Sequence, residues 1–245
     1  MNEEEKYQRA HLAELSARSR ARGVWTYSDF LSLHEQSLIP AGAAVRRIGG
    51  YEGAERVIAA FGSEEELGYS PEPPLNVVRV ASVSARFDRG MGHRDVLGAL
   101  MSLGIKRQCL GDILIGEHEA YVICLDSVAR HICDQLTAVG RTTVSCSMVE
   151  AVPDILTPEP EERSVVVASA RIDALVSAVF RMSRGEARTL FERELVFCDG
   201  RLIASPGFRP DPGSVISVRG RGRFRFEGES GRTKKDNAVV RCLVW

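Results

Sequence analysis

Apolar residues recur with the period of an α-helix early in the C-terminal third of the chain. Four of them fall at positions i, i+3, i+4 and i+7, which places them in one stripe along a helix: Ile172, Leu175, Val176 and Val179. Ser183 then stands three residues before Glu186, the spacing of a reciprocal capping box at a helix N-terminus. The apolar pattern continues with Ala187, Leu190 and Phe191. The pattern predicts two short amphipathic helices in succession.

A hairpin is predicted directly after these helices. Asp199-Gly200 separates the apolar runs 195–198 and 202–203, and this dipeptide favours a two-residue type I′ turn. The polar positions of this unit are mostly arginine, whose guanidinium group binds phosphate through paired hydrogen bonds. We therefore expect phosphate contacts from Arg171, Arg184, Arg188 and Arg201, with Ser183 capping the second helix and offering its amide end to an anion.

A second basic feature is the strict alternation of residues 218–226. If this segment is extended, a period of two places every second residue on one face. The face predicted to bind phosphates carries Arg219, Arg221, Arg223 and Arg225, and the opposite face carries Gly220, Gly222, Phe224 and Phe226. Two other interpretations stay open: a flexible Arg-Gly segment that orders on binding, or an edge strand whose charges only prevent aggregation. The apolar residues 239–245 predict a final strand that closes the sheet.

The middle of the chain alternates between strand and helix patterns. Proline-rich stretches at 69–74 and 153–162 bound it, because proline removes a backbone donor and favours extended linkers. The predicted elements are strands at 76–84, 112–115, 120–125 and 142–149, and helices at 94–103 and from Asp126 to about 140. The order strand, helix, strand, strand, helix, strand is typical of a split β-α-β, or ferredoxin-like, domain, a scaffold shared by RNA-binding and unrelated proteins.

Residues 1–70 are predicted to be mainly helical. Leu12 and Leu15 mark a first helix. A second begins at Ser28 or Asp29 and runs to Leu38, and a third spans 54–61. The fold class predicted for the whole chain is α+β in three parts: a helical N-terminal region at 1–70, a ferredoxin-like domain at 75–150, and a small arginine-rich α+β domain at 164–245.

Charge is divided unevenly along the chain. Residues 164–245 hold 15 Lys and Arg against 9 Asp and Glu, a net charge of +6, whereas residues 1–163 hold 17 against 24, a net charge of −7. A basic module on an acidic body is typical of nucleic-acid-binding proteins, although such asymmetry is also common on solvated faces. The helix and hairpin pattern makes us favour nucleic acid.

Composition excludes several other classes. No apolar run is long enough to cross a membrane, and the acidic N-terminus has no apolar stretch of signal-peptide length. The six cysteines form no Cys-x-x-Cys pair, so we expect reduced thiols and no zinc site. These features predict a cytoplasmic protein.

No catalytic or nucleotide-binding motif is found in the sequence. His93-Arg94-Asp95 lacks the other kinase motifs and is better explained as a helix start with an acidic first turn. Lys106 and Arg107 follow Gly104 and either contact phosphate or complement a helix end; we favour phosphate contact. No cofactor, metal or small-molecule substrate is expected.

The C-terminal motifs resemble the RNA-binding domain named after ribosomal small-subunit protein four. That pattern has Arg-Leu-Asp at the first helix, Ser-Arg before the second, then Gly-x-Val-x-Val-Asn-Gly and a Pro-Gly-Asp turn. The matching segments are Arg171-Ile172-Asp173, Ser183-Arg184, Val196-Phe197-Cys198-Asp199-Gly200 and Pro212-Gly213-Ser214. The chain departs from the pattern at Glu194, where glycine is usual, and at Ser214, where aspartate is usual. Glu194 indicates a backbone conformation there that a non-glycine residue tolerates.

A series of short motifs extends along the whole chain: Gly49-Gly50-Tyr51 with Ala54-Glu55-Arg56, His93-Arg94-Asp95-Val96-Leu97-Gly98-Ala99-Leu100, Gly104-Ile105-Lys106-Arg107, Gly111-Asp112-Ile113, Val139-Gly140-Arg141, residues 217–224 and Thr233-Lys234-Lys235. Motifs in this order resemble the YlmH family. The resemblance implies a bacterial RNA-binding protein without catalysis, associated with the large ribosomal subunit and peptidyl-tRNA in quality control of stalled translation. It also implies a gene near cell-division genes.

The function expected from the residues and the resemblance together is non-catalytic docking on ribosomal RNA or tRNA. One alternative is an RNA-modifying enzyme, since this type of domain is often appended to one; Asp88, His93 and Asp95 are its only obvious catalytic candidates. A third interpretation is a protein-interaction module in cell division.

Overall fold

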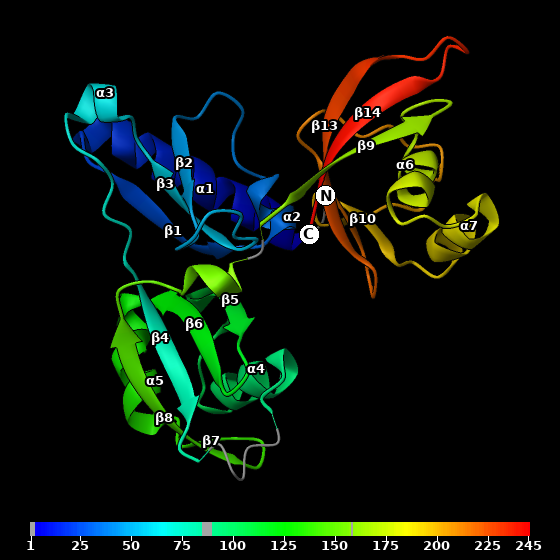
Figure 1. The fold of residues 1–245 in the computed structure, drawn as a ribbon. Coiled ribbons are helices and arrows are strands. Elements are labelled where there is room, and N and C mark those ends of the chain that lie inside the picture. The colour runs from blue at the N-terminus through cyan, green and yellow to red at the C-terminus, as the bar shows by residue number, and fades with distance from the viewer. Residues whose placement is uncertain (1–2, 85–89, 158) are drawn as a thin grey trace. The chain divides into compact units, whose positions relative to one another are not determined.

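The computed structural model describes residues 3–84, 90–157 and 159–245. The chain forms two compact units, Met1–Thr157 and Pro158–Trp245 (Figure 1). Helices and strands occur in both units, so the predicted α+β class is confirmed.

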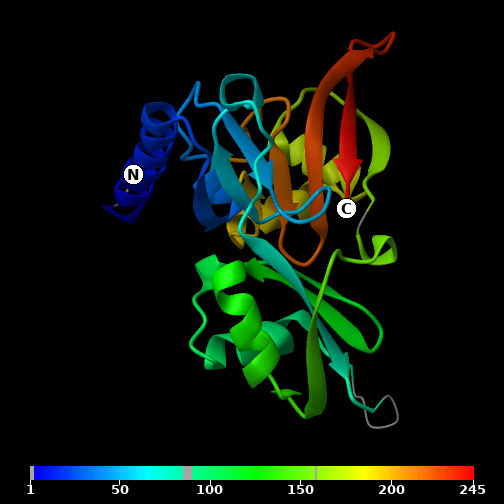
Figure 2. The same cartoon turned by 90° about the vertical axis from the view of Figure 1, so that its left-hand side faces the viewer.

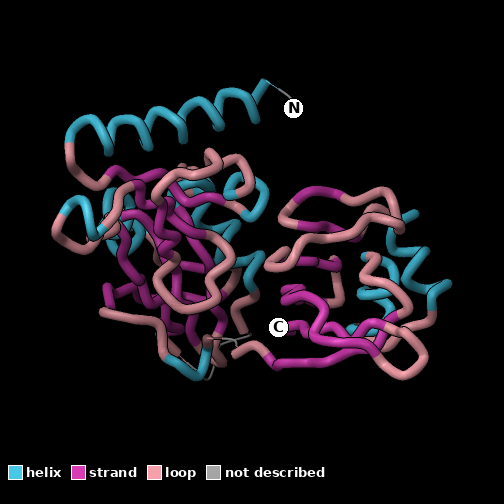
Figure 3. Tube along the Cα trace, turned by 90° about the horizontal axis from the view of Figure 1, so that it is seen from above, coloured by secondary structure: helices cyan, strands magenta, loops and turns pink. Residues whose placement is uncertain are grey.

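A long helix and a small antiparallel sheet form the N-terminal part of the first unit. Helix α1 spans Glu3–Arg22 and runs along the sheet, whose strand order is β1-β3-β2 (Figure 3). The strands are β1 at Thr26–Leu31, β2 at Val45–Ile48 and β3 at Val57–Phe61. Two single-turn helices complete it, α2 at Leu33–Gln36 and α3 at Glu64–Leu67.

The prediction of a mainly helical region at 1–70 is wrong after the first helix. The segments predicted as the second and third helices form β1, the short α2 and β3, and the residue that caps α2 is Ser32. Every residue of β3 is buried, because α1 covers one face beside Ala59 and the middle sheet contacts the other beside Ile58. A short apolar run buried on both faces lacks the alternation that identifies a strand.

The predicted order of elements in the middle of the chain is confirmed. The strands are β4 at Leu75–Ser82, β5 at Leu110–Ile115, β6 at Glu119–Leu125, β7 at Ala138–Val139 and β8 at Thr142–Val149. The helices are α4 at His93–Ser102, α5 at Asp126–Gln135, and the 3-10 turns η2 at Arg107–Cys109 and η3 at Asp154–Leu156. The antiparallel sheet has the order β5-β6-β4-β8-β7, with α4 and α5 on one face (Figure 2).

Helix α5 is shorter than the sequence predicted. The backbone leaves the helix at Leu136, where ψ is 97°. Ala138 and Val139 then pair with β8 as strand β7. The extended pairing therefore replaces the last predicted turn of the helix.

The N-terminal sheet and the middle sheet share a hydrophobic core. The face of the middle sheet opposite its helices contributes Val77, Leu114, Tyr121 and Ile123, which pack with Phe30 and Ile58. Gly111 allows the close approach, because a Cβ atom there would lie 2.8 Å from the ring of Phe30. The two sheets thus belong to one compact unit.

The second unit is a six-stranded antiparallel sheet with two helices on one face (Figure 1). The strand order is β11-β10-β12-β13-β14-β9. The elements are β9 at Glu161–Val167, α6 at Ile172–Val179, α7 at Arg184–Glu192, β10 at Val196–Cys198, β11 at Arg201–Leu202, β12 at Val215–Val218, β13 at Gly222–Arg232 and β14 at Ala238–Val244.

The local predictions for α6, α7 and their hairpin are confirmed. The four stripe residues of α6 are fully buried against the sheet, and burial of each such side chain contributes about 1.5–3 kcal/mol. Asp199 and Gly200 both have positive φ, 49° and 74°, as a type I′ turn requires. The predicted final strand forms as β14, in the interior of the sheet between β13 and β9.

Glu194 has a left-handed backbone conformation, although the presence of a non-glycine residue predicted a more tolerant one. Its φ is 56°, in the left-handed region that favours glycine, and its amide donates to the carbonyl of Phe191. The chain therefore turns after α7 as it would with glycine, and the non-glycine residue bears the strain.

We expect residues 158–245 to unfold as one cooperative unit when produced alone. The core of the second unit is drawn entirely from this segment, and Arg163 in β9 donates to the carbonyl of Val179 at the end of α6 at 2.9 Å. A fragment that begins at 164 loses the pairing of Glu161, Glu162 and Arg163 with β14 and should melt at a lower temperature. Thermal unfolding followed by circular dichroism compares the two. A longer fragment without a cooperative transition would contradict the boundary.

Replacing Glu194 by glycine should stabilise the second unit. Glycine relieves the left-handed strain of the folded state but adds entropy to the unfolded chain. The net increase in the free energy of unfolding should be roughly 0.5–1 kcal/mol. Glu194→Ala is the matched control, because it removes the charge and keeps the strain. Urea unfolding measures both variants; an equal gain in the two would attribute the effect to charge and not to the backbone.

Candidate RNA-binding surface

Two arginines extend into solvent from the first turns of α7. Arg184 is the first residue of the helix, and Arg188 follows one turn later. Nε of Arg188 lies 3.6 Å from Oε1 of Glu192, but both side chains are exposed, and such a pair contributes at most about 1 kcal/mol. Arg184 has no ion-pair partner within the described part of the chain. Both predicted phosphate-binding residues are therefore accessible on one helix.

The N-terminus of α7 is closed by the predicted capping box. The amide of Glu186 donates to Oγ of Ser183 at 3.2 Å, and the amide of Ser183 donates to Oε2 of Glu186 at 2.8 Å. These hydrogen bonds hold the pKa of Glu186 below its usual value, and the charge of Arg221 acts in the same direction. Ser183 caps the helix as predicted, but the carboxylate of Glu186 lies at the end that the sequence offered to a phosphate.

Arg171 and Arg201 lie before and after this helix in the sequence, and their side chains differ in how far neighbouring groups hold them. Arg171 precedes α6 and is held by Asp173 through two hydrogen bonds, Nε to Oδ1 at 3.1 Å and Nη2 to Oδ2 at 3.0 Å. Its guanidinium is thus oriented and partly neutralised. Arg201 is exposed on the edge strand β11, directly after the Asp199-Gly200 turn.

The predicted continuous arginine strand over 218–226 is wrong in its first half. β12 ends at Val218, and residues 219–221 form a turn in which Gly220 has a φ of 78°. The amide of Arg221 donates to the carbonyl of Val218 across this turn. The predicted alternation is present from β13 onward, where Phe224 and Phe226 are buried and Arg223 and Arg225 lie on the opposite face. A glycine that can adopt positive φ broke the strand.

The four arginines of this segment therefore have separate surroundings. Arg219 lies over the ring of Phe197, 4.5 Å from its centroid, and Arg223 lies 5.4 Å from the ring centroid of Trp245. Arg225 is paired with Glu227. Arg221 is exposed in the turn and acts on Glu186 of α7. The structure brings Arg221, and not the whole series, to the beginning of α7.

Lys106 and Arg107 belong to the first unit and differ in their exposure to solvent. Lys106 is exposed before the η2 turn. Arg107 is half-buried and its Nη1 donates to the carbonyls of Leu110 at 2.8 Å and Gly111 at 3.1 Å. Burial first, and then the neighbouring charge of Arg56, lower the pKa of Arg107 to about 10. Sequence reasoning placed Arg56 only in a family motif and missed that it lies beside Arg107, and no pattern in a single sequence links two residues so far apart.

The residues of the enzymatic alternative show no catalytic arrangement among those described. Asp88 lies outside the described residues. Asp95 accepts a hydrogen bond from the amide of Gly92 at 3.1 Å as part of the cap of α4, and His93 is exposed at the start of that helix. Over the described ranges, no group of three His, Cys, Asp or Glu could hold a metal ion.

The six cysteines are all unpaired, as predicted. Burial raises the pKa of Cys124 and Cys198 to about 12 and the pKa of Cys146 and Cys242 to about 11. The same cause raises the pKa of Cys109 and Cys133. A thiol with a raised pKa is mostly protonated, and therefore a poor nucleophile, at neutral pH.

Comparison with known proteins connects this arrangement to a family. A protein of Bacillus subtilis (strain 168), "Ribosome-associated protein quality control protein P2", is 32% identical over 218 residues, which cover 85% of this chain and 83% of that protein. The chain belongs to the YlmH family. The family model described as "Putative RNA-binding domain in YlmH" matches residues 78–152, which hold most of the middle sheet and both of its helices.

A solved structure named "Cell division protein ylmH from Streptococcus pneumoniae" is also similar to this YlmH-family chain. It is 21% identical with a TM-score of 0.48, and the match covers 61% of this chain and 93% of the other. Among the described residues, no helix is long and apolar enough to cross a membrane.

The environment of Glu186 gives a pH test of the geometry at α7. Because the folded-state pKa of Glu186 is depressed, its stabilising effect is present above the unfolded-state pKa and is lost as pH falls through the folded-state pKa. Ser183→Ala should therefore lower the melting temperature near neutral pH and have a smaller effect in acid. In an NMR titration, Ser183→Ala should raise the pKa of Glu186 more than Arg221→Gln does. No change with Arg221→Gln would contradict the placement of Arg221 beside α7.

Proposed function

We propose that this protein is a non-catalytic RNA-binding factor that docks on ribosomal RNA, tRNA or both, on the large ribosomal subunit, during quality control of stalled translation. Membership of the YlmH family supports the proposal, as does the name of the Bacillus subtilis relative, which places that relative at the ribosome in protein quality control. The match of residues 78–152 to a family model named for RNA binding supports a second RNA contact in the first unit. We further propose a cytoplasmic location.

The observation that carries the proposal is the pair Arg184 and Arg188 on α7. Both guanidinium groups are exposed, they stand one turn apart, and the capping box fixes the helix that presents them. Arg221 adds a third exposed charge near the start of the same helix. Rigid placement of several guanidinium groups suits the regularly spaced phosphates of a structured RNA.

The same arrangement favours docking over sequence readout. Phosphate contacts position a protein on RNA but do not identify bases. Arg171, Arg201, Arg219, Arg223 and Arg225 would add contacts of graded strength, because several are engaged by neighbouring groups. We propose that the target is recognised by its shape, as double-stranded RNA regions generally are.

An RNA-modifying enzyme remains the second candidate function. It would rest on Asp88, His93 and Asp95, and the cap formed by Asp95 already accounts for one of them. We propose a role without catalysis for this reason.

Removing Arg184 and Arg188 together should flatten the salt dependence of RNA binding. Each neutralised phosphate contributes about 0.7–0.9 to the slope of log K against log salt, so loss of two contacts lowers the slope by about 1.4–1.8. Fluorescence anisotropy with a structured fragment of ribosomal RNA at several salt concentrations measures this. Stability should change little, because both side chains are exposed.

Lys234→Ala with Lys235→Ala is the matched control. Both lysines are exposed on the turn between β13 and β14, and their replacement removes the same amount of charge as replacement of the arginine pair. If the control lowers the salt-dependence slope equally, RNA binding depends on the overall positive charge of the protein and not on specific phosphate contacts at α7. Crosslinking in cells with the wild type and both double variants then identifies the RNA that depends on the arginine pair.

A further inference from the structure

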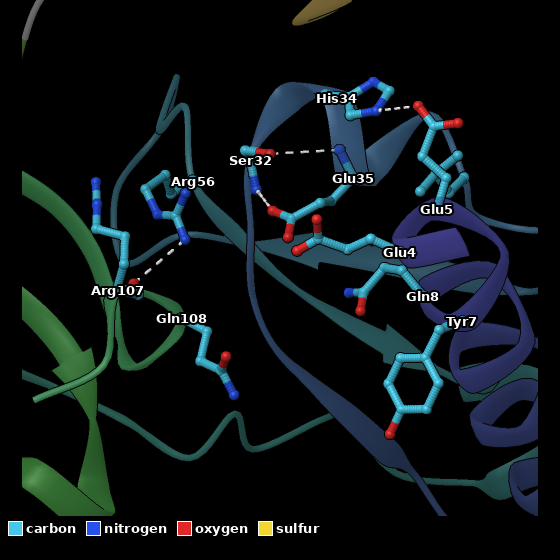
Figure 4. Close-up of a pocket in the computed structure, with 11 residues that line it drawn as sticks. Glu4, Glu5, Tyr7, Gln8, Ser32, His34, Glu35, Arg56, Arg107 and Gln108 are labelled. Carbon is cyan, nitrogen blue, oxygen red and sulfur yellow. Dashed lines mark hydrogen bonds and ion pairs between the residues drawn. The ribbon is translucent and has the colours of Figure 1, made fainter. Parts of the chain in front are cut away.

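The first unit contains a cavity that RNA binding by the second unit does not use. It has a volume of about 520 Å³, within the range of small-molecule sites, and lies between α1, α2 and the η2 turn (Figure 4). Its lining includes Glu4, Tyr7, Gln8, Glu35, Arg56 and Arg107. These side chains provide two groups of opposite charge.

The basic side of the cavity consists of two adjacent guanidinium groups. Nε of Arg56 donates to the carbonyl of Leu110 at 2.9 Å, and Nη1 of Arg107 donates to the same carbonyl at 2.8 Å. Arg56 also donates from Nη2 to the carbonyl of Phe30 at 2.9 Å. All of these acceptors are neutral, so the hydrogen bonds orient the two guanidinium groups without pairing either of them with a carboxylate.

No carboxylate forms an ion pair with either guanidinium among residues 3–84, 90–157 and 159–245. The carboxylates of Glu35, Asp112 and Glu55 act on both arginines through their charge. The oxygens of Asp112 accept hydrogen bonds from the hydroxyl of Tyr51 at 2.8 Å and from the amides of Glu55 and Arg56 at 2.7 and 3.1 Å. Burial lowers the pKa of Arg107 first, and the like charge of the adjacent Arg56 lowers it further. A bound anion with two charges would relieve this repulsion.

The opposite side of the cavity presents acceptors. Glu35 is fixed by the amide of Ser32, which donates to its Oε2 at 2.6 Å, and its carboxylate lies with that of Glu4 and the amide of Gln8 across from Arg56 (Figure 4). Tyr7 is 75% exposed and leaves a ring face available at the rim. A ligand for this cavity must therefore be anionic at one end and carry N–H donors at the other.

We propose that this cavity binds one nucleoside monophosphate unit whose base has an exocyclic amino group, with guanine the best match. Its phosphate contacts the free guanidinium N–H groups of Arg56 and Arg107. The amino and imino N–H groups of the base donate to the carboxylates of Glu35 and Glu4, and Tyr7 stacks on the base. Uracil lacks the amino donor and fits less well. The unit is either a free nucleotide or an unpaired nucleotide of an RNA strand.

Calorimetric titration of the full-length protein with GMP, UMP, guanosine and inorganic phosphate tests this directly. GMP should bind most tightly, because among these four it alone combines a phosphate with both the amino and the imino donor. Arg107→Gln should weaken GMP binding about tenfold or more, since it removes a charged hydrogen bond. Arg47→Gln, which removes an exposed arginine of β2 outside the cavity lining, should stay within about twofold of wild type.

Glu4→Gln keeps the proposal testable if Arg107→Gln does not fold. Glu4 is exposed on α1, so its replacement should leave the fold intact, weaken GMP binding and spare inorganic phosphate binding. Failure of GMP to saturate the wild type at millimolar concentration, or unchanged GMP affinity in Arg107→Gln or Glu4→Gln, would overturn the proposal. Competition by a single-stranded oligonucleotide with one guanosine indicates RNA as the source of the nucleotide, and the absence of competition indicates a free nucleotide.

The outcome is independent of RNA docking by the second unit. The double variant at Arg184 and Arg188 should bind GMP as the wild type does. Loss of RNA docking with intact GMP binding in this variant would concern the proposal for α7 alone. Loss of GMP binding with intact RNA docking in a cavity variant would concern the cavity alone.

Discussion

The carboxylate of Asp112 holds the N-terminal part of the first unit against the middle sheet. It stands on β5 and accepts hydrogen bonds from the hydroxyl of Tyr51 and from the amides of Glu55 and Arg56, in the connection between β2 and β3. Once this connection is fixed, the side chain of Arg56 reaches the carbonyls of Leu110 and Phe30. This one carboxylate therefore fixes the connection that leads into β3 and the backbone of Arg56, whose guanidinium donates to the carbonyl of Arg107.

The second unit follows local sequence rules closely, and most of it could be predicted from them. A helical stripe, a capping box and a type I′ dipeptide each specify their own short segment. The N-terminal sheet does not follow such rules, because the burial of Phe30 and Ile58 depends on strands that lie far along the chain. Tertiary packing decided the structure there, and a local pattern contains no information about it.

The same distinction applies to the candidate sites. Exposure of Arg184 and Arg188 follows from helical periodicity, so the sequence placed them correctly on the outer face of α7. The ion pair of Arg225 with Glu227 could have been predicted from the sequence, because alternate residues of a strand lie on the same face. The sequence contains no signal for the approach of Arg56 to Arg107. These residues are 51 positions apart and meet because both donate to the carbonyl of Leu110.

The interior position of β14 has a consequence for synthesis of the chain. β9 is the first strand of the second unit to be made, yet within the described residues its one neighbour in the sheet is β14, the last strand. During translation β9 must therefore wait, with its backbone unpaired, until both helices and the intervening strands have emerged from the ribosome. Final assembly of the sheet is a late event that joins the two ends of the unit, and non-local pairing of this kind folds slowly. A nascent chain paused just before Ala238 would display an open sheet edge to the chaperones that survey new proteins.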